Sequence, residues 1–514
     1  MDAFDVLLRT TSTSGLVLRG AVVLAAIAII ISLIRAAASP LRSTPGPLLA
    51  RFSRMWYLKK VWTGELPRIN VDLHRRYGPV VRIAPNEYSL DDPAAVKTIY
   101  GLGTTFTKGP WYTASGLPFK KDWNMFQIPE NDKHILIRKK LAGLYTMSSL
   151  MKMEAQVDQC IDLIETRFRE IARSGTAMDL QEWMQFYAFD VIGNITVAKR
   201  FGFLDAGRDE MNLIRSLDFF LVYAARVGIY PELHKFLFLY GATGAQAMVK
   251  IIKFVREEME QYESDKPIGD DFFLARALRL HKEKPDYFTD VEIYNTAAAN
   301  INAGSDTTSI SLTAIMWNLL KHPESFAKLR AEIDTKISNG EASESLTFSD
   351  TQKMPYLQAV IKEALRLHPA AGLPMQRVVP KGGAQLAGLF FPEGTYVGIN
   401  SWVAHRNSEV FGSCVDDFRP ERWLTDDEET NLKMDRYFLT FGHGARTCLG
   451  KNISMMEICK VIPQLVRKFD FQLADPNAEL KTYNAWFVKQ ADLKVTVSER
   501  ELCSSLTHQQ VPLH

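Results

Sequence analysis

Ten residues near the C-terminus, 441–450, constrain this chain more than any other part of it. They read Phe-Gly-His-Gly-Ala-Arg-Thr-Cys-Leu-Gly. Gly442 and Gly444 permit positive φ and a close approach of the backbone to a flat cofactor. A helical pattern resumes at Leu449, which places Cys448 at a helix N-terminus. The helix dipole and the free N–H groups there stabilise a thiolate, the form of cysteine that binds metals.

The same ten residues match the haem-binding signature FxxGxRxCxG of the cytochrome P-450 superfamily at every fixed position. The resemblance implies that the chain binds haem b (iron protoporphyrin IX) with Cys448 as the axial ligand of the iron. Such a thiolate donates electron density to the iron and promotes O–O cleavage. The resemblance also assigns to cofactor binding Phe441, Gly442, Gly444, Gly450 and Arg446, the last as a partner of a haem propionate. The alternative is a buried structural cysteine after a glycine-rich turn.

A single long helix is predicted over residues 289–321. Thr289 and Glu292 form a capping box at its start, and His322-Pro323 ends it. At 1.5 Å per residue the helix is roughly 45 Å long, enough to cross a whole domain. Glycine and threonine are poor helix formers, so their clustering in residues 303–308 calls for a functional reason.

Residues 303–308 resemble the oxygen-activation motif of the same superfamily. The resemblance implies that Gly304 leaves room for dioxygen, that Thr307 holds hydrogen-bonded water there, and that Asp306 links the site to solvent. Cleavage of the O–O bond needs two protons, and such a pair would deliver them. The alternative is a kinked core helix with a capped hydroxyl group.

Glu363 and Arg366 lie at i, i+3 on one face of a predicted helix. Such a pair is common on helix surfaces and means little by itself. Its place ahead of Cys448, with Arg422 between them, matches the Glu/Arg network of the superfamily. The resemblance therefore implies that Glu363, Arg366 and Arg422 form a buried network behind the haem, with a structural role.

Haem propionates need cations, which the superfamily takes from a helix with a WxxxR pattern and from a strand. This chain has His134 in place of the tryptophan, followed by Arg138, and Arg377 lies on a candidate strand. The resemblance implies Arg138 and Arg377 as propionate ligands, with His134 as a further candidate. Each could instead be a surface cation.

The apolar stretch 16–34 contains one strongly polar residue, Arg19, and its length can span a bilayer. Arginines and lysines follow it, so the positive-inside rule predicts a body that faces the cytosol. The alternative is a cleaved signal peptide with an unusually long apolar core. Resemblance to microsomal members of the superfamily implies a single-pass anchor in the endoplasmic reticulum membrane.

The 514 residues, 46% of them hydrophobic, suffice for one large domain. We expect a short N-terminal segment over 1–15, a transmembrane anchor over 16–35, a proline-rich linker that leads into the body over 36–65, and a haem-thiolate monooxygenase domain over 66–514. Helical periodicity dominates the body, and candidate strands are few, at 80–83, 87–90, 376–379 and 395–399. The fold class is therefore mainly α, and the resemblance implies the P-450 fold of about a dozen or more helices with a small β-rich region. The net charge of +2 argues against a nucleic-acid partner.

No flavin-binding or phosphate-cradling segment is visible, so electrons must come from a separate protein. The resemblance implies a membrane-bound NADPH-cytochrome reductase docking at the cysteine side of the haem. The basic candidates for that surface are Lys139, Lys140, Lys451 and Lys460.

Segments that match the pocket-lining regions of the superfamily are apolar or aromatic and predict a lipophilic, aromatic or polycyclic substrate. They contain Trp111, Phe119, Trp123, Phe126, Phe219, Phe220, Tyr223, Ala299, Asn302, Ala303, Leu373, Met375, Trp486, Phe487 and Val488. Aromatic residues in a helical protein of this size are more often core, and that alternative stays open.

Residues 82–87 and 400–406 resemble the filamentous-fungal branch of the superfamily that includes pisatin demethylase-like enzymes. The branch implies a dioxygen-dependent monooxygenase of secondary metabolism that hydroxylates or O-demethylates a natural product. One alternative is a haem-thiolate isomerase or dehydratase, against which the intact Asp306-Thr307 pair counts. Another is a non-catalytic haem-binding membrane protein, in which a proton relay would be superfluous.

Overall fold

The computed structural model describes residues 3–119, 125–240, 249–257, 260 and 272–501. Its helices are α1 (Ala3–Ala38), α2 (Met55–Trp62), α3 (Leu66–Tyr77), α4 (Pro93–Tyr100), α5 (Asn131–Leu141), α6 (Met147–Leu150), α7 (Glu154–Ser174), α8 (Leu180–Val197), α9 (Phe203–Ala206), α10 (Leu213–Val227), α11 (His234–Leu239), α13 (Phe273–Glu283), α14 (Asp290–Lys321), α15 (Pro323–Ser338), α16 (Phe348–Thr351), α17 (Pro355–Leu367), α18 (Ser401–Ala404), α19 (Ser408–Phe411), α20 (Glu428–Tyr437) and α21 (Lys451–Lys468). Short 3-10 helices are η1 (Leu48–Arg51), η2 (Pro110–Ser115), η3 (Ala142–Tyr145), η4 (Met151–Met153), η5 (Pro231–Leu233), η6 (Pro420–Leu424) and η7 (Gly444–Arg446). The strands are β1 (Val80–Ala84), β2 (Glu87–Leu90), β3 (Thr107–Lys108), β4 (Met178–Asp179), β5 (Arg377–Val378), β6 (Ala384–Leu386), β7 (Leu389–Phe391), β8 (Tyr396–Ile399), β9 (Phe469–Leu473), β10 (Lys481–Asn484), β11 (Val488–Ala491) and β12 (Lys494–Glu499).

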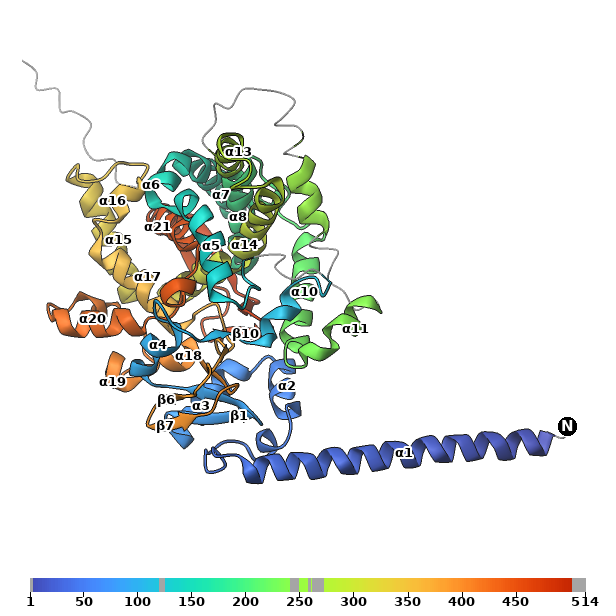
Figure 1. Ribbon diagram of the computed structural model, residues 1–514. Helices are drawn as coiled ribbons and strands as arrows, with labels where there is room; N and C mark the ends of the chain where they lie inside the picture. Colours follow the sequence, from blue (N-terminus) through green and yellow to red (C-terminus); the bar gives the residue numbers. More distant parts are fainter. Residues whose placement is uncertain (1–2, 120–124, 241–248, 258–259, 261–271, 502–514) are drawn as a thin grey trace, which may run out of the picture.

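Helix α14 runs through the centre of the helical body and packs against α8, α17 and α21 (Figure 1). The Thr289 hydroxyl accepts the N–H of Glu292, and the Glu292 carboxylate accepts the N–H of Thr289. The helix ends at His322, directly before the proline that begins α15. The helix predicted over 289–321 and its capping box are therefore confirmed.

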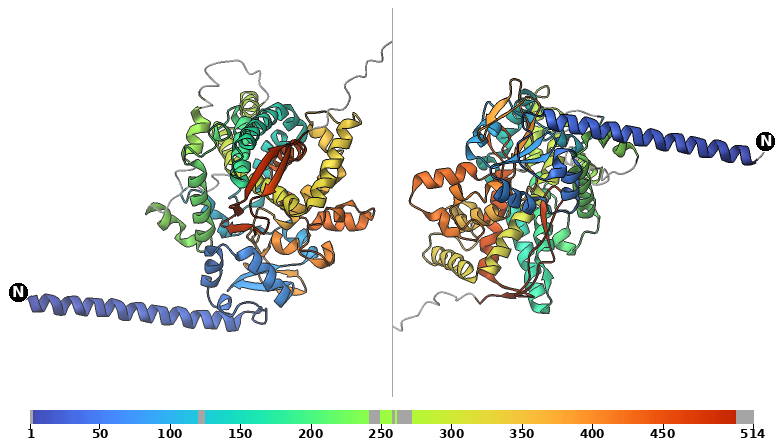
Figure 2. Two further views of the ribbon diagram at one scale, coloured as in Figure 1. Left: turned by 180° about the vertical axis from the view of Figure 1, so that it is seen from behind. Right: turned by 90° about the horizontal axis from the view of Figure 1, so that it is seen from below.

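The β structure is small. One sheet has the strand order β1-β2-β8-β5-β3, with β2 and β8 parallel. A second sheet has the order β4-β12-β9, and its C-terminal strands lie across the helices in the view from behind (Figure 2). The pairs β6–β7 and β10–β11 are hairpins. The four predicted strands fall on β1, β2, β5 and β8, with β5 shorter than expected, so the mainly helical class with a small β region is confirmed.

Helix α1 projects away from the body as a single long element (Figures 1 and 2). Its segment Gly20–Ala38 is long and apolar enough to cross a membrane. Leu24 and Ile30 are exposed, as expected for side chains that face lipid rather than protein. The helix begins before the predicted span of 16–35 and ends after it. On the C-terminal side, the Ala-rich sequence continues the helical conformation.

Candidate active site

Cys448 lies on the turn that leads into α21. Its N–H donates to the carbonyl oxygen of Phe441 at 2.7 Å, which closes the turn. Gly442 and Gly444 have φ of +73° and +63°, a region that L side chains rarely adopt. A Cβ at Gly444 would also lie 2.0 Å from the carbonyl oxygen of Tyr100. Glycine is thus required at 444 both for its conformation and for the close packing of this turn on α4.

The Cys448 residue is solvent-accessible, and its sulfur accepts hydrogen bonds from the N–H groups of Gly450 and Lys451. Burial by the surrounding protein raises the pKa of the Cys448 thiol, while these N–H groups and the Arg138 cation oppose that rise. The expected effect of the helix N-terminus is present, but burial outweighs it. Metal binding to a cysteine displaces the thiol proton, and the two N–H groups and Arg138 favour the thiolate that results.

Helix α14 carries an accessible stripe in an otherwise buried stretch. Ala299 and Ala303 are exposed and Thr307 is partly exposed, while most of their neighbours are buried. Residues spaced four apart share one helix face. The hydroxyl of Thr308 donates to that of Ser454 at 3.0 Å, which fixes this part of α14 beside the first turns of α21. The stripe and the turn that carries Cys448 therefore border one site.

Thr307 and Gly304 differ in what they face. The Thr307 hydroxyl donates to the carbonyl of Ala303 at 2.8 Å, so the lone pairs of its oxygen are left to accept a hydrogen bond from the site. A Cβ at Gly304 would instead lie 3.0 Å from the side chain of Ile192 on α8. The expectation that Gly304 leaves room for dioxygen is wrong: this glycine lets α14 pack closely on α8, and Ala303 is the small residue on the accessible stripe.

Asp306 is fully buried and faces α8 and β11. Its Oδ1 accepts a hydrogen bond from Gln185 at 2.6 Å and lies 2.9 Å from Nζ of Lys489. Its Oδ2 has no hydrogen-bond partner within the described part of the chain. Asp306 is thus adjacent in sequence to the site-facing Thr307, while the side chain of Asp306 points toward α8 and β11.

Three cations gather next to the Cys448 turn. Lys108 and Arg377 are cross-strand neighbours on β3 and β5, and Arg446 lies in η7. Burial, then Arg377 and Arg446, lower the pKa of Lys108 well below its usual value. Burial and then Arg377 lower the pKa of Arg446 to about 10. Within the described ranges no carboxylate forms a hydrogen-bonded ion pair with these three groups, and Glu130 only partly offsets the charge at Arg446. Buried cations that repel one another require an anionic partner, and the two propionates of haem match that requirement.

The expected propionate ligands occupy different positions around this cluster. Arg138 donates to the carbonyl of Thr447 at 2.7 Å, next to the cysteine. Arg377 donates to the Tyr112 hydroxyl at 3.2 Å and to the carbonyl of Gln376 at 2.9 Å. His134 is buried, and its Nδ1 has no hydrogen-bond partner among the residues that the structure describes. Burial, then Arg446, lower its pKa to about 3, so it is neutral.

Arg446 and Lys108 each hold the segment between η2 and α5. Arg446 donates to the carbonyls of Ile128 and Pro129, both at 2.8 Å. Lys108 donates to the carbonyl of Phe126, and its ammonium lies 3.8 Å from the centre of that ring. Sequence reasoning missed Lys108, because its pairing with Arg377 depends on a two-residue strand that has no periodic signal.

The structure brings Glu363, Arg366 and Arg422 together in the core. Arg366 donates to both carboxylate oxygens of Glu363, at 2.9 and 2.8 Å, and Arg422 donates to Oε1 at 2.8 Å. The indole N–H of Trp423 donates to Oε2 at 2.9 Å, and the N–H of Arg419 donates to Oε1 at 3.0 Å. Burial raises the pKa of Glu363, but the hydrogen bonds and charges of the arginines outweigh it and hold that pKa below its usual value.

His405 joins this network to the chain that leads into the cysteine turn. Its Nδ1 bonds the carbonyl of Arg366 at 3.0 Å, and its Nε2 accepts the N–H of Leu439 at 2.8 Å. These partners assign the neutral tautomer with the proton on Nδ1. Burial lowers the pKa of His405 to about 3, consistent with that form. The network thus positions the backbone just upstream of residues 441–448.

Several of the expected pocket-lining aromatic residues do meet. The rings of Trp111 and Trp486 lie 4.5 Å apart between centres, and those of Phe126 and Trp486 lie 5.2 Å apart. Tyr223 instead turns to α11, where its hydroxyl bonds Nδ1 of His234 at 2.9 Å. Phe219 is exposed on α10. Trp123 lies outside the described residues.

Two of the four lysines expected on a docking surface are already engaged. Lys460 is buried and forms ion pairs of 2.5 and 2.7 Å with Glu154 and Asp158. Its assignment to the surface is wrong, because it lies on the buried face of α21. Lys140 pairs with Glu292 of α14 at 2.7 Å.

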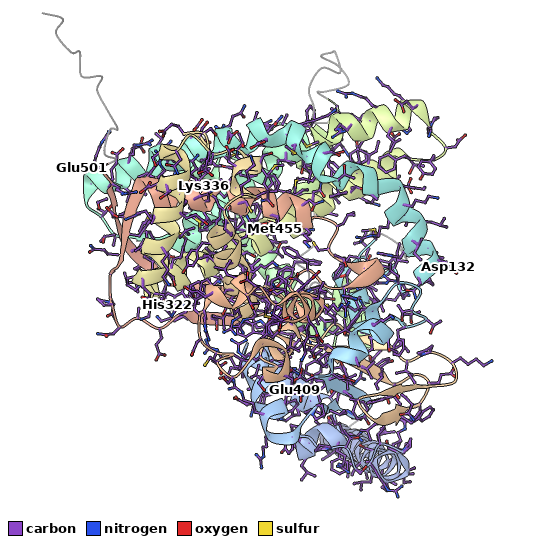
Figure 3. The ribbon with its side chains drawn as sticks, turned by 90° about the vertical axis from the view of Figure 1, so that its left-hand side faces the viewer. Asp132, His322, Lys336, Glu409, Met455 and Glu501 are labelled. Atoms are coloured by element: carbon purple, nitrogen blue, oxygen red, sulfur yellow. The ribbon has the colours of Figure 1, made fainter. Side chains whose placement is uncertain are left out.

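The other two, Lys139 and Lys451, are exposed. They belong to α5 and to the first turn of α21. In Figure 3, Asp132 of α5 lies at the right-hand margin and Met455 of α21 lies closer to the centre.

Comparison with known proteins identifies the family. The profile of the cytochrome P-450 family matches residues 45–497. Pisatin demethylase of Fusarium vanettenii is 39% identical over 461 residues, which cover 88% of this chain and 89% of that protein. Cytochrome P-450 monooxygenase gsfF of Penicillium aethiopicum is 37% identical over 90% of this chain and 94% of its own length. A third relative, cytochrome P-450 monooxygenase cicH of Emericella nidulans, is 35% identical over 89% of this chain and 93% of its own length. An accessible cysteine at a helix N-terminus, a cluster of cations beside it and these matches together establish that the chain belongs to the cytochrome P-450 family and is a haem-binding monooxygenase.

Proposed function

We propose that this monooxygenase hydroxylates or oxidatively O-demethylates a lipophilic aromatic natural product in fungal secondary metabolism. One atom of dioxygen enters the substrate and the other leaves as water, with two electrons from NADPH and two protons. Haem, held by the Cys448 sulfur and by cations that include Arg377, Arg446 and Lys108, supplies the oxygen chemistry. The protein supplies orientation, exclusion of water and proton delivery through Thr307 and Asp306.

The observation that carries this proposal is the accessible stripe of α14 beside the cysteine turn. Small residues at 299 and 303 keep this face of α14 open, and Thr307 adds one hydroxyl oxygen able to accept a hydrogen bond. An isomerase or dehydratase has no need of such a hydroxyl, so the arrangement favours oxygen activation.

The substrate class is supported by the aromatic wall formed by Trp111, Tyr112, Phe126 and Trp486, whose adjacent rings pack edge-on or tilted. Flat apolar ligands pack well against such walls. Two similar proteins from Fusarium vanettenii bear the name pisatin demethylase, which motivates the demethylation alternative. A screen of aromatic methyl ethers with reductase and NADPH, monitored for the phenol and formaldehyde, tests it. Hydroxylated products without formaldehyde would favour simple hydroxylation.

We expect Thr307→Ala to lower the share of NADPH electrons recovered in product by about tenfold or more and to release hydrogen peroxide instead, because the hydroxyl that accepts a hydrogen bond in the site is lost. Thr313→Ala is the matched control, since its hydroxyl donates to the carbonyl of Ser309 at 2.8 Å in the same way but within the core. Peroxide and product are measured per NADPH consumed. Equal coupling in the two variants would refute the role of Thr307.

The electron donor we propose is a membrane-bound NADPH-cytochrome reductase that docks on the side bearing Lys139 and Lys451. Both lysines are exposed and lie on elements adjacent to Cys448. The double variant Lys139→Glu/Lys451→Glu is expected to slow reductase-supported reduction of the haem several-fold at low salt, with a smaller effect at high salt. The control is Lys381→Glu, on the loop before β6. Unchanged reduction rates in the double variant would place the docking surface elsewhere.

We further propose that the protein resides in the endoplasmic reticulum membrane with the body facing the cytosol. Basic residues follow the apolar segment of α1, as the positive-inside rule requires for that orientation. Apolar side chains also remain exposed near the anchor and on α11, namely Leu48, Leu49, Met55, Trp62, Phe236 and Leu239. Protease protection of sealed microsomes tests the orientation, with loss of the body on protease treatment as the expected result.

A further inference from the structure

Lys489 of β11 bridges two carboxylates that belong to different helices. Its Nζ lies 2.9 Å from Oδ1 of Asp306 on α14, and it forms a second ion pair with Asp218 on α10. Gln185 of α8 donates to the same Oδ1 of Asp306 at 2.6 Å. Four elements therefore meet at the acid that precedes the site-facing threonine.

The three charged side chains form a gradient from core to surface. The exposed fraction of the side chain is 0% for Asp306, 20% for Lys489 and 45% for Asp218. Burial opposes the charge of Lys489, but Asp306 and then Asp218 outweigh it and raise the pKa of its ammonium. Burial raises the pKa of Asp218, with Lys489 opposing and Asp306 and Asp209 adding to the rise. Lys489 is thus the cation shared by an inner and an outer acid.

Asp306, the inner acid, has fewer hydrogen-bond partners than Glu363, the structural acid of the core. Glu363 accepts hydrogen bonds on both carboxylate oxygens from two arginines, an indole and a backbone N–H. Asp306 leaves its buried Oδ2 without a partner among the described residues. A buried carboxylate kept only for stability is expected to be fully satisfied. The unpaired oxygen leaves Asp306 able to accept a further hydrogen bond.

Lys489 and Asp218 also belong to the elements that surround the site. The residue before Lys489 is Val488, in the segment that continues from Trp486 of the aromatic wall. Helix α10, which carries Asp218, contacts that wall through Ala225, whose carbonyl lies 3.4 Å from Nε1 of Trp111. A shift of α10 or β11 against a bound ligand would therefore change the distance between Lys489 and its two acids.

We infer that Lys489 is a positioning residue for the oxygenase reaction: it sets the charge and orientation of Asp306, and Asp218 on α10 modulates this by competing for the same ammonium group. The inference rests on the proposed role of Asp306 in proton delivery. Removal of Lys489 leaves a buried carboxylate without a counter-ion, which takes up a proton instead. Removal of Asp218 leaves the ammonium group of Lys489 to Asp306 alone. This change strengthens the remaining ion pair, and its effect is opposite to that of removing Lys489.

The test uses the full-length haem-loaded protein with reductase and NADPH and no organic substrate. The water formed per NADPH is followed against pH. Lys489→Met is expected to move the pH midpoint of water formation upward by about one to three units, and Asp218→Asn to move it downward by less than about one unit. Lys489→Arg is expected to retain the original midpoint.

Asp306→Asn separates this inference from the function on which it rests. If Asp306→Asn leaves the pH dependence of water formation intact, the proposed role of Asp306 in proton delivery fails. If it removes that dependence while Lys489→Met and Asp218→Asn leave the midpoint unchanged, the inference about Lys489 is overturned. A merely structural bridge would lower the melting temperature of both variants without moving the pH midpoint of water formation. Should Lys489→Met not fold, the downward shift in Asp218→Asn still decides the question, because Asp218 lies at the surface.

Discussion

Cys448→Ser is expected to abolish the long-wavelength absorption band of the reduced carbon-monoxide complex and to eliminate monooxygenase turnover. The serine hydroxyl keeps the shape of the side chain, but it does not ionise or donate electron density as a thiolate does. The backbone hydrogen bonds of the turn, from the N–H of residue 448 to Phe441 and from the N–H of Thr447 to Gly444, do not involve the sulfur. A serine oxygen can accept the N–H groups of Gly450 and Lys451 in place of the sulfur. The fold should therefore persist, and the change should appear in the spectrum and in turnover rather than in stability.

Cys414→Ser is the matched control for this substitution. Cys414 is also accessible, but it lies in the loop after α19, outside the glycine-rich turn of residues 441–450 and away from a helix N-terminus. We expect the control to keep the thiolate spectrum and full turnover. The difference spectrum of dithionite-reduced protein under carbon monoxide measures both variants. A thiolate-type band in Cys448→Ser, or its loss in Cys414→Ser, would contradict the assignment of the axial ligand.

Glu363→Gln is expected to destabilise the protein by about 3–5 kcal/mol, because it leaves the buried guanidinium groups of Arg366 and Arg422 without their shared anion. The amide also presents donors to the donors of Trp423 and Arg419. A loss of this size is a large fraction of the stability of a typical domain, so little haem-loaded protein should accumulate. The free energy of unfolding in urea and the haem content of the purified protein measure the effect.

The matched control is Glu421→Gln on the neighbouring η6. Glu421 pairs with Lys328 and Tyr356, but it is 39% exposed, so its loss should cost less than about 1 kcal/mol. A comparable cost for both substitutions would show that burial of the Glu363 network does not matter.

The Glu363 network also predicts a direction for the pH dependence of stability. Because the arginines hold the pKa of Glu363 below its usual value, its ionised form stabilises the protein at and above the usual pKa of glutamate. That contribution is lost as the pH falls through the lowered pKa. In Glu363→Gln the corresponding part of the acid sensitivity should disappear.

The position of the chemistry along the chain was predictable from local sequence. Residues 441–450 carry a cysteine turn whose glycines adopt the positive φ that their type allows, and Thr289 with Glu292 marks the start of the central helix. These features depend on backbone conformation and hydrogen bonds between residues a few positions apart. Patterns of that range are visible in a single sequence.

The direction in which side chains point was less predictable. Gly304 faces Ile192 rather than the site, and Lys460 is buried against Glu154 although its helix begins at the surface. Both outcomes depend on which neighbouring helix covers a given face, and α7 and α8 lie far upstream in the sequence. Helical periodicity defines the faces of a helix but does not say what packs on each of them.

The sequence by itself determined that this protein is mainly helical, that its cysteine turn suits a haem iron and that its first helix can cross a membrane, because each property resides in one continuous segment. Only the tertiary structure decided that Lys108 joins Arg377 and Arg446, and that Lys489 stands between Asp306 and Asp218. Those groupings bring together charges from distant strands and helices. Their physical basis is the burial of like and unlike charges in one place, which no local pattern encodes.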